Sequence, residues 1–220
     1  MTVGYKTFDE DERQVLEHIM NLRRDVRGNR FVDKPLEQET LERILRAGLM
    51  APSVGFSQPW RFVTINEHKT KQAVANIFKQ ENDKAAPLFK DEQQQQYQQL
   101  KLEGITESSV NVAVFYEHKE DAVLGQTSMS KTGEYSVVCA IQNMWLMARA
   151  LNVGLGWVSI LDAPEVETLL GAHARQSLVA YLCIGYVDTF YDRPELETLG
   201  WDTQKAFQDV VFNESLNTNQ

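Results

Sequence analysis

Residues 132–152, TGEYSVVCAIQNMWLMARALN, are followed directly by VGLGWVSIL at 153–161, and these two runs decide the fold. The first run is apolar around most of its circumference, which predicts a helix that is central and covered on all sides. The second run is glycine-rich and otherwise mostly apolar, which predicts a turn that leads into a strand. A buried helix followed by a strand of a sheet is therefore the centre of the predicted fold.

Hydrophobic periodicity extends the prediction on both sides of these runs. Helices are expected at 9–22, 36–50, 67–80 and 164–171, and strands at 61–66, 110–117 and 177–188. The acidic start DEDE suits the N-terminus of the first helix electrostatically. Because helices and strands mix without a regular βαβ rhythm, and because no repeat or linker is visible, a single α+β domain over 1–220 is predicted.

The composition limits the class of protein. The chain of 220 residues contains 22 Lys and Arg and 31 Asp and Glu, a net charge of −9, so nucleic acid and membranes are not expected as partners. No secretory signal and no bilayer-spanning apolar run are visible, so a cytoplasmic location is expected. Cys139 and Cys183 fall in apolar segments, and we expect two buried thiols rather than a disulfide.

Three segments lie outside the regular pattern. The run APSVGFSQPW at 51–60 contains two prolines and a glycine, which is typical of a loop. Residues 81–109 are polar and rich in glutamine, and they form either a solvated helix pair or a mobile lid over a site. Residues 189–220 carry aromatic side chains with weak periodicity, so an arm that packs on a second subunit is expected.

The run LRRDVRGNRF at 22–31 concentrates arginine in an acidic chain. Arg23, Arg24 and Arg27 can present two guanidinium groups on one side of a helix end. Guanidinium groups bind phosphate oxygens in a bidentate way, so a phosphate site is one interpretation, and a solvated basic face is the other. Asp25 stands in the middle of this cluster, where its carboxylate would repel an anion.

Several classes of enzyme lack their signatures in this chain. The run VGLGWV has neither the third glycine nor the strand-turn-helix order of a dinucleotide-binding fingerprint, and no P-loop occurs. The GxSxG motif of serine hydrolases is also missing. No metal is expected, because the histidines do not have metal-ligand spacing. They are His18, His68, His118 and His173.

The order and spacing of the remaining motifs resemble the FMN-dependent nitroreductase superfamily over residues 12–190. RRDVR, APSVGFSQPW and the late glycine-rich strand are similar to the parts from which that superfamily builds an FMN site across a dimer interface. The resemblance implies a three-layer fold with a central, mostly antiparallel sheet flanked by helices. It also implies a homodimer that exchanges its C-terminal arms.

Within the superfamily the sequence resembles the 5,6-dimethylbenzimidazole synthase branch. RRDVR, APSVGFSQPW, KLEGI, VGLGWVSI and PELETLGW carry this closer resemblance. Asp25 and Phe56 stand where typical nitroreductases have a small residue and an asparagine. The implied reaction uses O2 to fragment reduced FMN to 5,6-dimethylbenzimidazole, the lower ligand of vitamin B12, with release of erythrose 4-phosphate. A separate flavin reductase would supply reduced FMN.

The resemblance also implies roles for single residues. Arg23, Arg24 and Arg27 would hold the FMN phosphate and nearby polar atoms. Asp25 would point the other way on the helix and face the isoalloxazine ring as an ionised proton acceptor. Ser159 is the second expected catalytic residue, and a serine bonded to its own backbone at a strand end is the alternative. The residues expected to bind FMN are Arg23, Arg24, Asp25, Val26, Arg27, Ser53, Leu102, Gly156 and Ser159.

Two alternative functions stay open from the sequence. The first is an NAD(P)H-dependent nitroreductase or flavin reductase that keeps FMN as a prosthetic group. The second is a flavin-binding protein without catalytic activity.

Some aromatic and basic side chains also have two interpretations. Trp60 either stacks near the site or fills the core, and Arg193 can reach the phosphate from the C-terminal arm. Met144, Trp145 and Met147 are better explained as core residues than as cofactor contacts.

Overall fold

The structure is a computed structural model that describes residues 6–216. The chain divides into two compact units, of which the first ends at Phe190 and the second begins at Tyr191. The helices of the first unit are α1 (Glu10–Leu22), α2 (Gln38–Leu49), α3 (His68–Ala85), α4 (Asp91–Gln99), α5 (Thr132–Ala150) and α6 (Ala163–Leu169), with 3₁₀ turns η1 (Gly28–Arg30), η2 (Val54–Phe56) and η3 (Ala86–Leu88). Its strands are β1 (Trp60–Ile65), β2 (Val110–Glu117), β3 (Gly154–Val158) and β4 (Gln176–Gly185). The second unit contains the short helices α7 (Glu195–Thr198) and α8 (Phe207–Val210).

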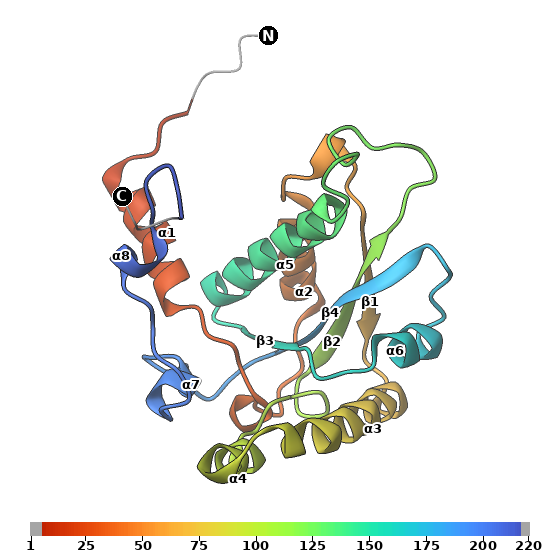
Figure 1. Cartoon of the computed structure of the whole chain (residues 1–220), viewed down its shortest axis with the longest axis vertical. Helices are drawn as coiled ribbons and strands as arrows, with labels where there is room; N and C mark the ends of the chain where they lie inside the picture. The colour runs from red at the N-terminus through yellow and green to blue at the C-terminus, as the bar shows by residue number, and fades with distance from the viewer. Residues whose placement is uncertain (1–5, 217–220) are drawn as a thin grey trace. The chain divides into compact units, whose positions relative to one another are not determined.

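The four strands form one antiparallel sheet in the order β1-β2-β4-β3 (Figure 1). The second strand lies at its centre, and Val112 is opposite both Thr64 of β1 and Leu182 of β4. The predicted α+β class, with an antiparallel sheet flanked by helices, is confirmed. The exchanged C-terminal arm stays a prediction.

Two hydrophobic cores lie on opposite faces of this sheet, because successive side chains of a strand point to opposite faces. Ile44 of α2 and Met144 of α5 pack with Val112 on one face. Val74 of α3 packs with Ala113 on the other face, together with α6. Figure 1 shows the two helix pairs on either side of the sheet, which makes the first unit a three-layer structure.

The predicted elements agree well with the observed ones. Strand 110–117 coincides with β2, and helices 9–22 and 36–50 match α1 and α2 to within two residues. The acidic start of α1 forms a capping box, in which the Asp9 carboxylate accepts the Glu12 N–H at 2.9 Å and the Glu12 carboxylate accepts the Asp9 N–H at 3.1 Å.

The large side chains with two interpretations belong to the core. Met144 is fully buried, and Trp145 and Met147 pack partly buried against the same cluster. Trp60 is 5% exposed and lies in that cluster as well, so it fills the core.

One face of α5 differs from the prediction. Tyr135 and Val138 are 51% and 39% exposed, so the prediction that this helix is covered on all sides is wrong for the single chain. Cys139 lies on the same helix and is exposed, whereas Cys183 is buried as predicted. Both thiols are free, and burial raises the pKa of Cys183 to about 12. The physical reason for the difference is that α2 and the sheet cover only part of the circumference of α5.

The polar segment 81–109 contains the end of α3, η3 and α4. The Tyr97 hydroxyl donates to the Asn82 side-chain oxygen at 2.7 Å, and the rings of Tyr97 and Phe89 stack 4.6 Å apart. These contacts hold α4 to the end of α3. A role as a lid stays a prediction.

Within residues 6–216, no helix combines the length and the apolar character that crossing a membrane requires. Among the side chains that the structure describes, no group of three or more His, Cys, Asp or Glu is arranged to hold a metal ion.

Candidate functional site

The arginine-rich run begins where α1 ends, at Leu22. Arg23 is extended, with φ −66° and ψ 135°, and Asp25 forms a parallel bridge with Leu155 of β3. The Val26 N–H donates to the Leu155 carbonyl at 3.1 Å. The expected helical arrangement of this run is therefore wrong. The outer edge of β3 offers unpaired backbone groups, and the run pairs with them instead of continuing α1.

This extended backbone decides which side chains meet. Alternate residues of a strand project to the same side, so Asp25 and Arg27 lie together while Val26 is buried on the other side. The Asp25 Oδ2 atom lies 2.5 Å from Arg27 Nη2, and Asp25 Oδ1 accepts the Trp157 N–H at 3.0 Å. The expectation that Asp25 points away from all the arginines is wrong, because that expectation assumed a helix.

The guanidinium of Arg27 also contacts the segment that follows α4. Its Nη1 donates to the Leu102 carbonyl at 2.7 Å. Beside this bond, the Gly28 N–H donates to the Glu103 carbonyl at 2.8 Å. Leu102 thus reaches the arginine-rich run through its main chain.

Arg23 and Arg24 are held by Trp145 on α5. The Arg23 guanidinium lies 4.9 Å from the centre of the Trp145 ring, a favourable cation–π arrangement. The Trp145 Nε1–H donates to the Arg24 carbonyl at 3.1 Å. Both arginines are half-buried, and the Arg24 guanidinium donates to the Asn21 and Arg23 carbonyls at 2.7 Å each.

Gly156 allows β3 and the arginine-rich run to approach closely. A Cβ atom at this position would lie 2.1 Å from the Val26 carbonyl oxygen and 3.6 Å from an Asp25 carboxylate oxygen. No side chain fits there, so glycine is required for the contact that positions Asp25.

Ser159 lies one residue beyond the end of β3, and its side chain is exposed. It follows Trp157, whose N–H binds Asp25, by two residues, a chain length of about 7 Å. The chain length limits how far Ser159 can lie from the acid, and a contact between the two side chains stays a prediction.

Ser53 lies in a different place. Its hydroxyl accepts the Gln58 N–H at 3.0 Å, and the next residue, Val54, donates its N–H to Ser136 Oγ at 3.1 Å. Ser136 is in the second turn of α5, nine residues from Trp145, which corresponds to roughly 13 Å along the helix. The single chain does not bring Ser53 to the arginines.

The loop around Ser53 has an unusual backbone. Phe56 and Gln58 have positive φ values of 52° and 47°, which non-glycine residues rarely adopt. Phe56 is also 81% exposed. Strained backbone of this kind gathers at functional sites, which fits the expected role of this loop.

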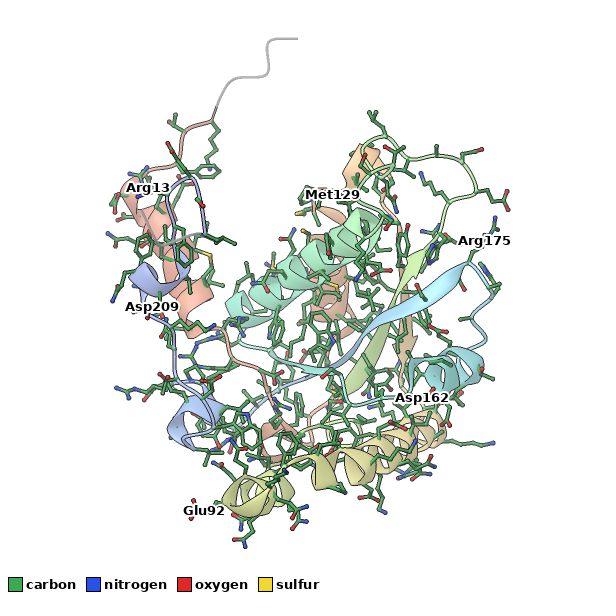
Figure 2. The ribbon with its side chains drawn as sticks, in the orientation of Figure 1. Arg13, Glu92, Met129, Asp162, Arg175 and Asp209 are labelled. Carbon is green, nitrogen blue, oxygen red and sulfur yellow. The ribbon has the colours of Figure 1, made fainter. Side chains whose placement is uncertain are left out.

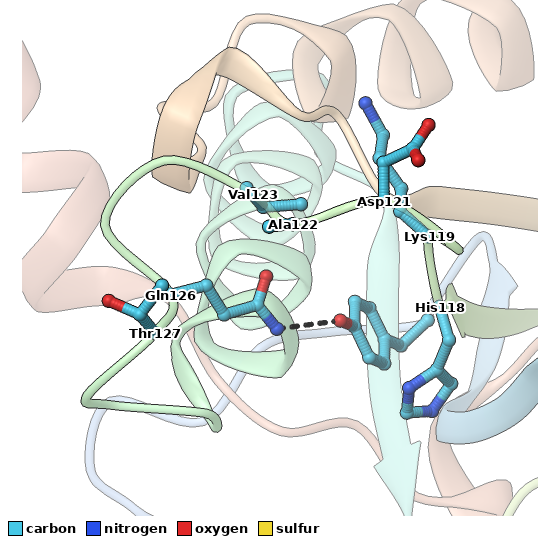
Figure 3. Close-up of a pocket in the computed structure, with 8 residues that line it drawn as sticks. His118, Lys119, Asp121, Ala122, Val123, Gln126 and Thr127 are labelled. Atoms are coloured by element: carbon cyan, nitrogen blue, oxygen red, sulfur yellow. Dashed lines mark hydrogen bonds between the residues drawn. The ribbon is translucent and has the colours of Figure 1, made fainter.

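Three cavities lie away from the arginine-rich run. One of about 260 Å³ is lined by the loop after β2, where the Gln126 side chain donates to the Tyr116 hydroxyl at 2.8 Å (Figure 3). A second, of about 590 Å³, lies between α3 and α6, near Asp162 in Figure 2. The third, of about 320 Å³, includes Arg175, which is also labelled in Figure 2. These cavities do not include the predicted site residues.

Three residues that fix the site are absent from the sequence-based prediction. Trp157 binds Asp25 through its N–H, Trp145 binds the Arg24 carbonyl, and Glu103 binds Gly28. A signal existed only for Trp157, which lies next to Gly156 in the glycine-rich motif. The contact between Trp145 and Arg24 joins residues 121 positions apart, a distance that no local pattern reveals.

Comparison with known proteins identifies the class to which this fold and site belong. The model of the nitroreductase family matches residues 21–186. That range is most of the chain, so the chain belongs to the nitroreductase family.

Curated relatives place it more narrowly. The chain is 42% identical over 200 residues to the 5,6-dimethylbenzimidazole synthase of Rhodospirillum rubrum, covering 90% of this chain and 94% of that protein. It is 37% identical over 197 residues to the 5,6-dimethylbenzimidazole synthase of Rhodobacter capsulatus, covering 88% and 94%. The chain is therefore a member of the 5,6-dimethylbenzimidazole synthase branch of the family.

Solved structures agree on the fold. An iodotyrosine deiodinase bound to FMN and 3-iodo-L-tyrosine superimposes with a TM-score of 0.68 at 22% identity, covering 82% of this chain and 95% of the other. NfrA1 of B. megaterium gives a TM-score of 0.70 at 17% identity, covering 94% and 76%. These likenesses confirm the nitroreductase-like fold.

Proposed function

We propose that this protein uses O2 to convert reduced FMN to 5,6-dimethylbenzimidazole and releases erythrose 4-phosphate. The observation that carries the proposal is the Asp25 carboxylate, which Arg27 and the Trp157 amide fix inside the arginine-rich run. A member of the synthase branch with this acid in place has a proton acceptor where typical nitroreductases have none.

The side chains of the run are chemically suited to FMN. Arg23 and Arg24 supply two half-buried guanidinium groups, which match the oxygens of a phosphate. In a chain with net charge −9, such a local cluster is what an anionic ligand needs. Because residue 156 is a glycine, no side chain fills the space beside Val26 and Asp25. When bound, reduced FMN supplies the electron-rich ring that reacts with O2.

Asp25 is well placed to move protons. An ionised carboxylate has about four lone-pair positions on its two oxygens. Arg27 contacts one oxygen and the Trp157 N–H binds the other, which sets the plane of the group, and in this proposal the carboxylate accepts a proton from the ligand. Its role is therefore that of a general base with a fixed orientation. Ser159 would add a hydroxyl, which can donate or accept a hydrogen bond without a charge.

A homodimer would complete the site. Ser53 and the arginine-rich run are both expected to bind FMN, but in one chain the segments that carry them contact α5 nine residues apart, at Ser136 and at Trp145. In a dimer, Ser53 of one subunit can approach the arginines of the other. The exposed apolar side chains of Tyr135 and Val138 on α5 support this assembly, because burying them stabilises an interface. The exchanged arm at 189–220 belongs to the same proposal.

Further parts of the proposal concern supply and access. The polar segment 81–109 would serve as a lid that excludes water from the site. A lid of this kind leaves no room for a nicotinamide, so a separate flavin reductase would deliver reduced FMN. We also infer a cytoplasmic location, in line with the expectation from the sequence.

Product identification tests the proposal. The purified protein is mixed with excess FMN and a chemical reductant in air, and the products are separated by chromatography and identified by mass. We expect 5,6-dimethylbenzimidazole and erythrose 4-phosphate in equal amounts. Flavin that is recovered intact, together with peroxide, would contradict the proposal. Rapid reduction of the bound flavin by NADPH would instead identify a nitroreductase or flavin reductase.

A further inference from the structure

The side chain of Arg27 joins two parts of the molecule that the sequence separates widely. One nitrogen, Nη2, lies 2.5 Å from Asp25 Oδ2, and the other, Nη1, donates to the Leu102 carbonyl at 2.7 Å. The side chains of Arg27 and Asp25 are only 17% and 29% exposed, so solvent screens this ion pair less than a surface pair. Arg27 is therefore in contact with the expected catalytic acid and with the expected lid at the same time.

The lid segment ends in the core, where Ile105 is fully buried, and hydrogen bonds hold the part that precedes it. Away from the arginine-rich run, the Tyr97–Asn82 hydrogen bond holds α4 to α3. Next to the arginine-rich run, residues 101–103 are held by Arg27 and by the Gly28 N–H, which donates to the Glu103 carbonyl at 2.8 Å. This second anchor thus depends on the arginine-rich run.

Two neighbouring ion pairs of Lys101 stiffen this anchor. The Lys101 ammonium pairs with the carboxylates of Glu103 and Glu107, the second at 2.8 Å. Carboxylate partners raise the pKa of Lys101 although its burial acts in the opposite direction, so this ammonium stays charged. The Glu103 carboxylate also accepts the Ile105 N–H at 2.6 Å. Residues 101–103 are therefore tied to Ile105, which is fully buried in the core on the α3 side of the sheet.

We propose that Arg27 is a positioning residue that couples closure of the lid segment to the orientation of the Asp25 carboxylate. When residues 101–103 are seated, the Leu102 carbonyl fixes one arm of the guanidinium, and the other arm holds Asp25 Oδ2. When they leave, the guanidinium loses that acceptor and is able to rotate away from Asp25. The acid then keeps the Trp157 N–H but loses Arg27.

The planar guanidinium is the reason why arginine is needed here. Its N–H groups form a rigid fork, so two acceptors in different directions are held in one fixed relation. A lysine ammonium can pair with Asp25, but it transmits no orientation between Asp25 and Leu102. By linkage, if lid seating affects Asp25, then Asp25 must affect lid seating to the same degree.

Two backbone amides report on the two ends of this coupling in the ligand-free protein. The Gly28 N–H is protected from hydrogen exchange only while Glu103 is seated, and the Trp157 N–H only while Asp25 is in place. Exchange is measured residue by residue in the wild type, Arg27→Lys, Asp25→Asn and the double variant. The amide of Val112 at the centre of the sheet reports global unfolding, and rates are expressed relative to it.

We expect Arg27→Lys to speed exchange of both reporter amides by about tenfold or more, as the loss of the hydrogen bond from a charged group to the Leu102 carbonyl predicts. We expect Asp25→Asn to speed exchange of the Gly28 amide, which Asp25 does not touch. In the double variant, the relative exchange rate of each reporter amide should exceed that of the faster single variant by less than about twofold, because the two residues act through one path. Arg30→Lys is the matched control, since Arg30 follows in the same segment and pairs with Asp188 instead.

The Asp25→Asn result decides the question even if Arg27→Lys unfolds the chain. A Gly28 amide that exchanges at the wild-type relative rate in Asp25→Asn would overturn the coupling. Additive effects in the double variant would do the same. The inference rests on the proposed function for the role of Asp25, but the exchange experiment contains no FMN. Its failure and a failure to form product are therefore separate outcomes.

Discussion

The Asp25 carboxylate and the Arg27 guanidinium form an ion pair, with 2.5 Å between Oδ2 and Nη2, two residues apart on an extended segment beside β3. This relationship explains why an acid stands among arginines. Asp25 pairs with one of them, and in the proposed function Arg23 and Arg24 supply the positive charge for an anionic ligand. On that proposal the acid and the anion site are neighbours without direct conflict.

Replacing Asp25 with asparagine should abolish the reaction. The amide cannot accept a proton as the carboxylate does, so we expect product formation to fall about 100-fold or more. The variant should still bind FMN, because the phosphate ligands are unchanged. Chromatography of the products from reduced FMN in air measures the effect. Asp33→Asn, an exposed position with the same substitution, is the control. An unchanged rate in Asp25→Asn would rule out the proposed base.

Loss of a phosphate ligand should weaken FMN binding. Arg23→Gln removes a half-buried charge, and we expect the Kd for FMN to rise about tenfold or more. Quenching of flavin fluorescence during titration measures this Kd. The exposed Arg46→Gln on α2 makes the same change in net charge at a distance and should have little effect. Equal weakening by both variants would point to net charge rather than to a site.

Gly156→Ala should disturb the fold locally. The added methyl group would lie 2.1 Å from the Val26 carbonyl oxygen, so the arginine-rich run must shift away from β3. We expect the free energy of unfolding to fall by about 1–3 kcal/mol, as for other overpacked sites, and FMN binding to weaken. Urea denaturation measures the first effect. A variant as stable as the wild type would show that the two segments separate easily.

Ser159→Ala should slow the reaction without affecting the fold. Its exposed side chain makes no contribution to the core, so stability should stay within about 0.5 kcal/mol. We expect product formation to fall about tenfold, the effect of one lost hydrogen bond. Rates at saturating reduced FMN check this expectation. A wild-type rate would return Ser159 to the role of a strand-end serine.

The two cysteines should react differently with a thiol reagent at pH 8. Burial raises the pKa of Cys183 to about 12, so almost no thiolate is present and the folded protein should not react there. Cys139 is exposed on α5, so it should react in the monomer and be protected when two copies pair through this helix. Alkylation followed by mass spectrometry, at protein concentrations above and below dissociation of the dimer, measures both sites. Equal labelling of Cys139 at all concentrations would exclude α5 from the interface.

Local patterns are sufficient to predict most elements of the fold. The apolar run of β2 and the capping signal of α1 act within a few residues, so both elements lie where the sequence predicts them. The exposed face of α5 is not predictable in this way, because exposure depends on which neighbours cover a helix. Tyr135 and Val138 have the pattern of core residues and lie at the surface of the single chain.

For the site as well, some features are predictable from the sequence and others are not. The order of its motifs is enough to indicate the family and to single out Arg23, Asp25 and Gly156. The arrangement of their side chains is not predictable from the run itself, because it directly follows a helical pattern and no residue in it demands a change. The run leaves the helical path because it pairs with the edge of β3. The Trp157 amide that binds Asp25 lies 132 residues after Asp25 in the sequence.

The sequence by itself therefore determined the helices and strands, through periodicities that are local, and the family, through the order and spacing of its motifs. Only the tertiary structure decided that residues 23–27 are extended, that Asp25 pairs with Arg27, and that Leu102 joins them. The physical reason is that these contacts depend on unpaired backbone groups of distant segments. Those groups become neighbours only when the sheet has formed.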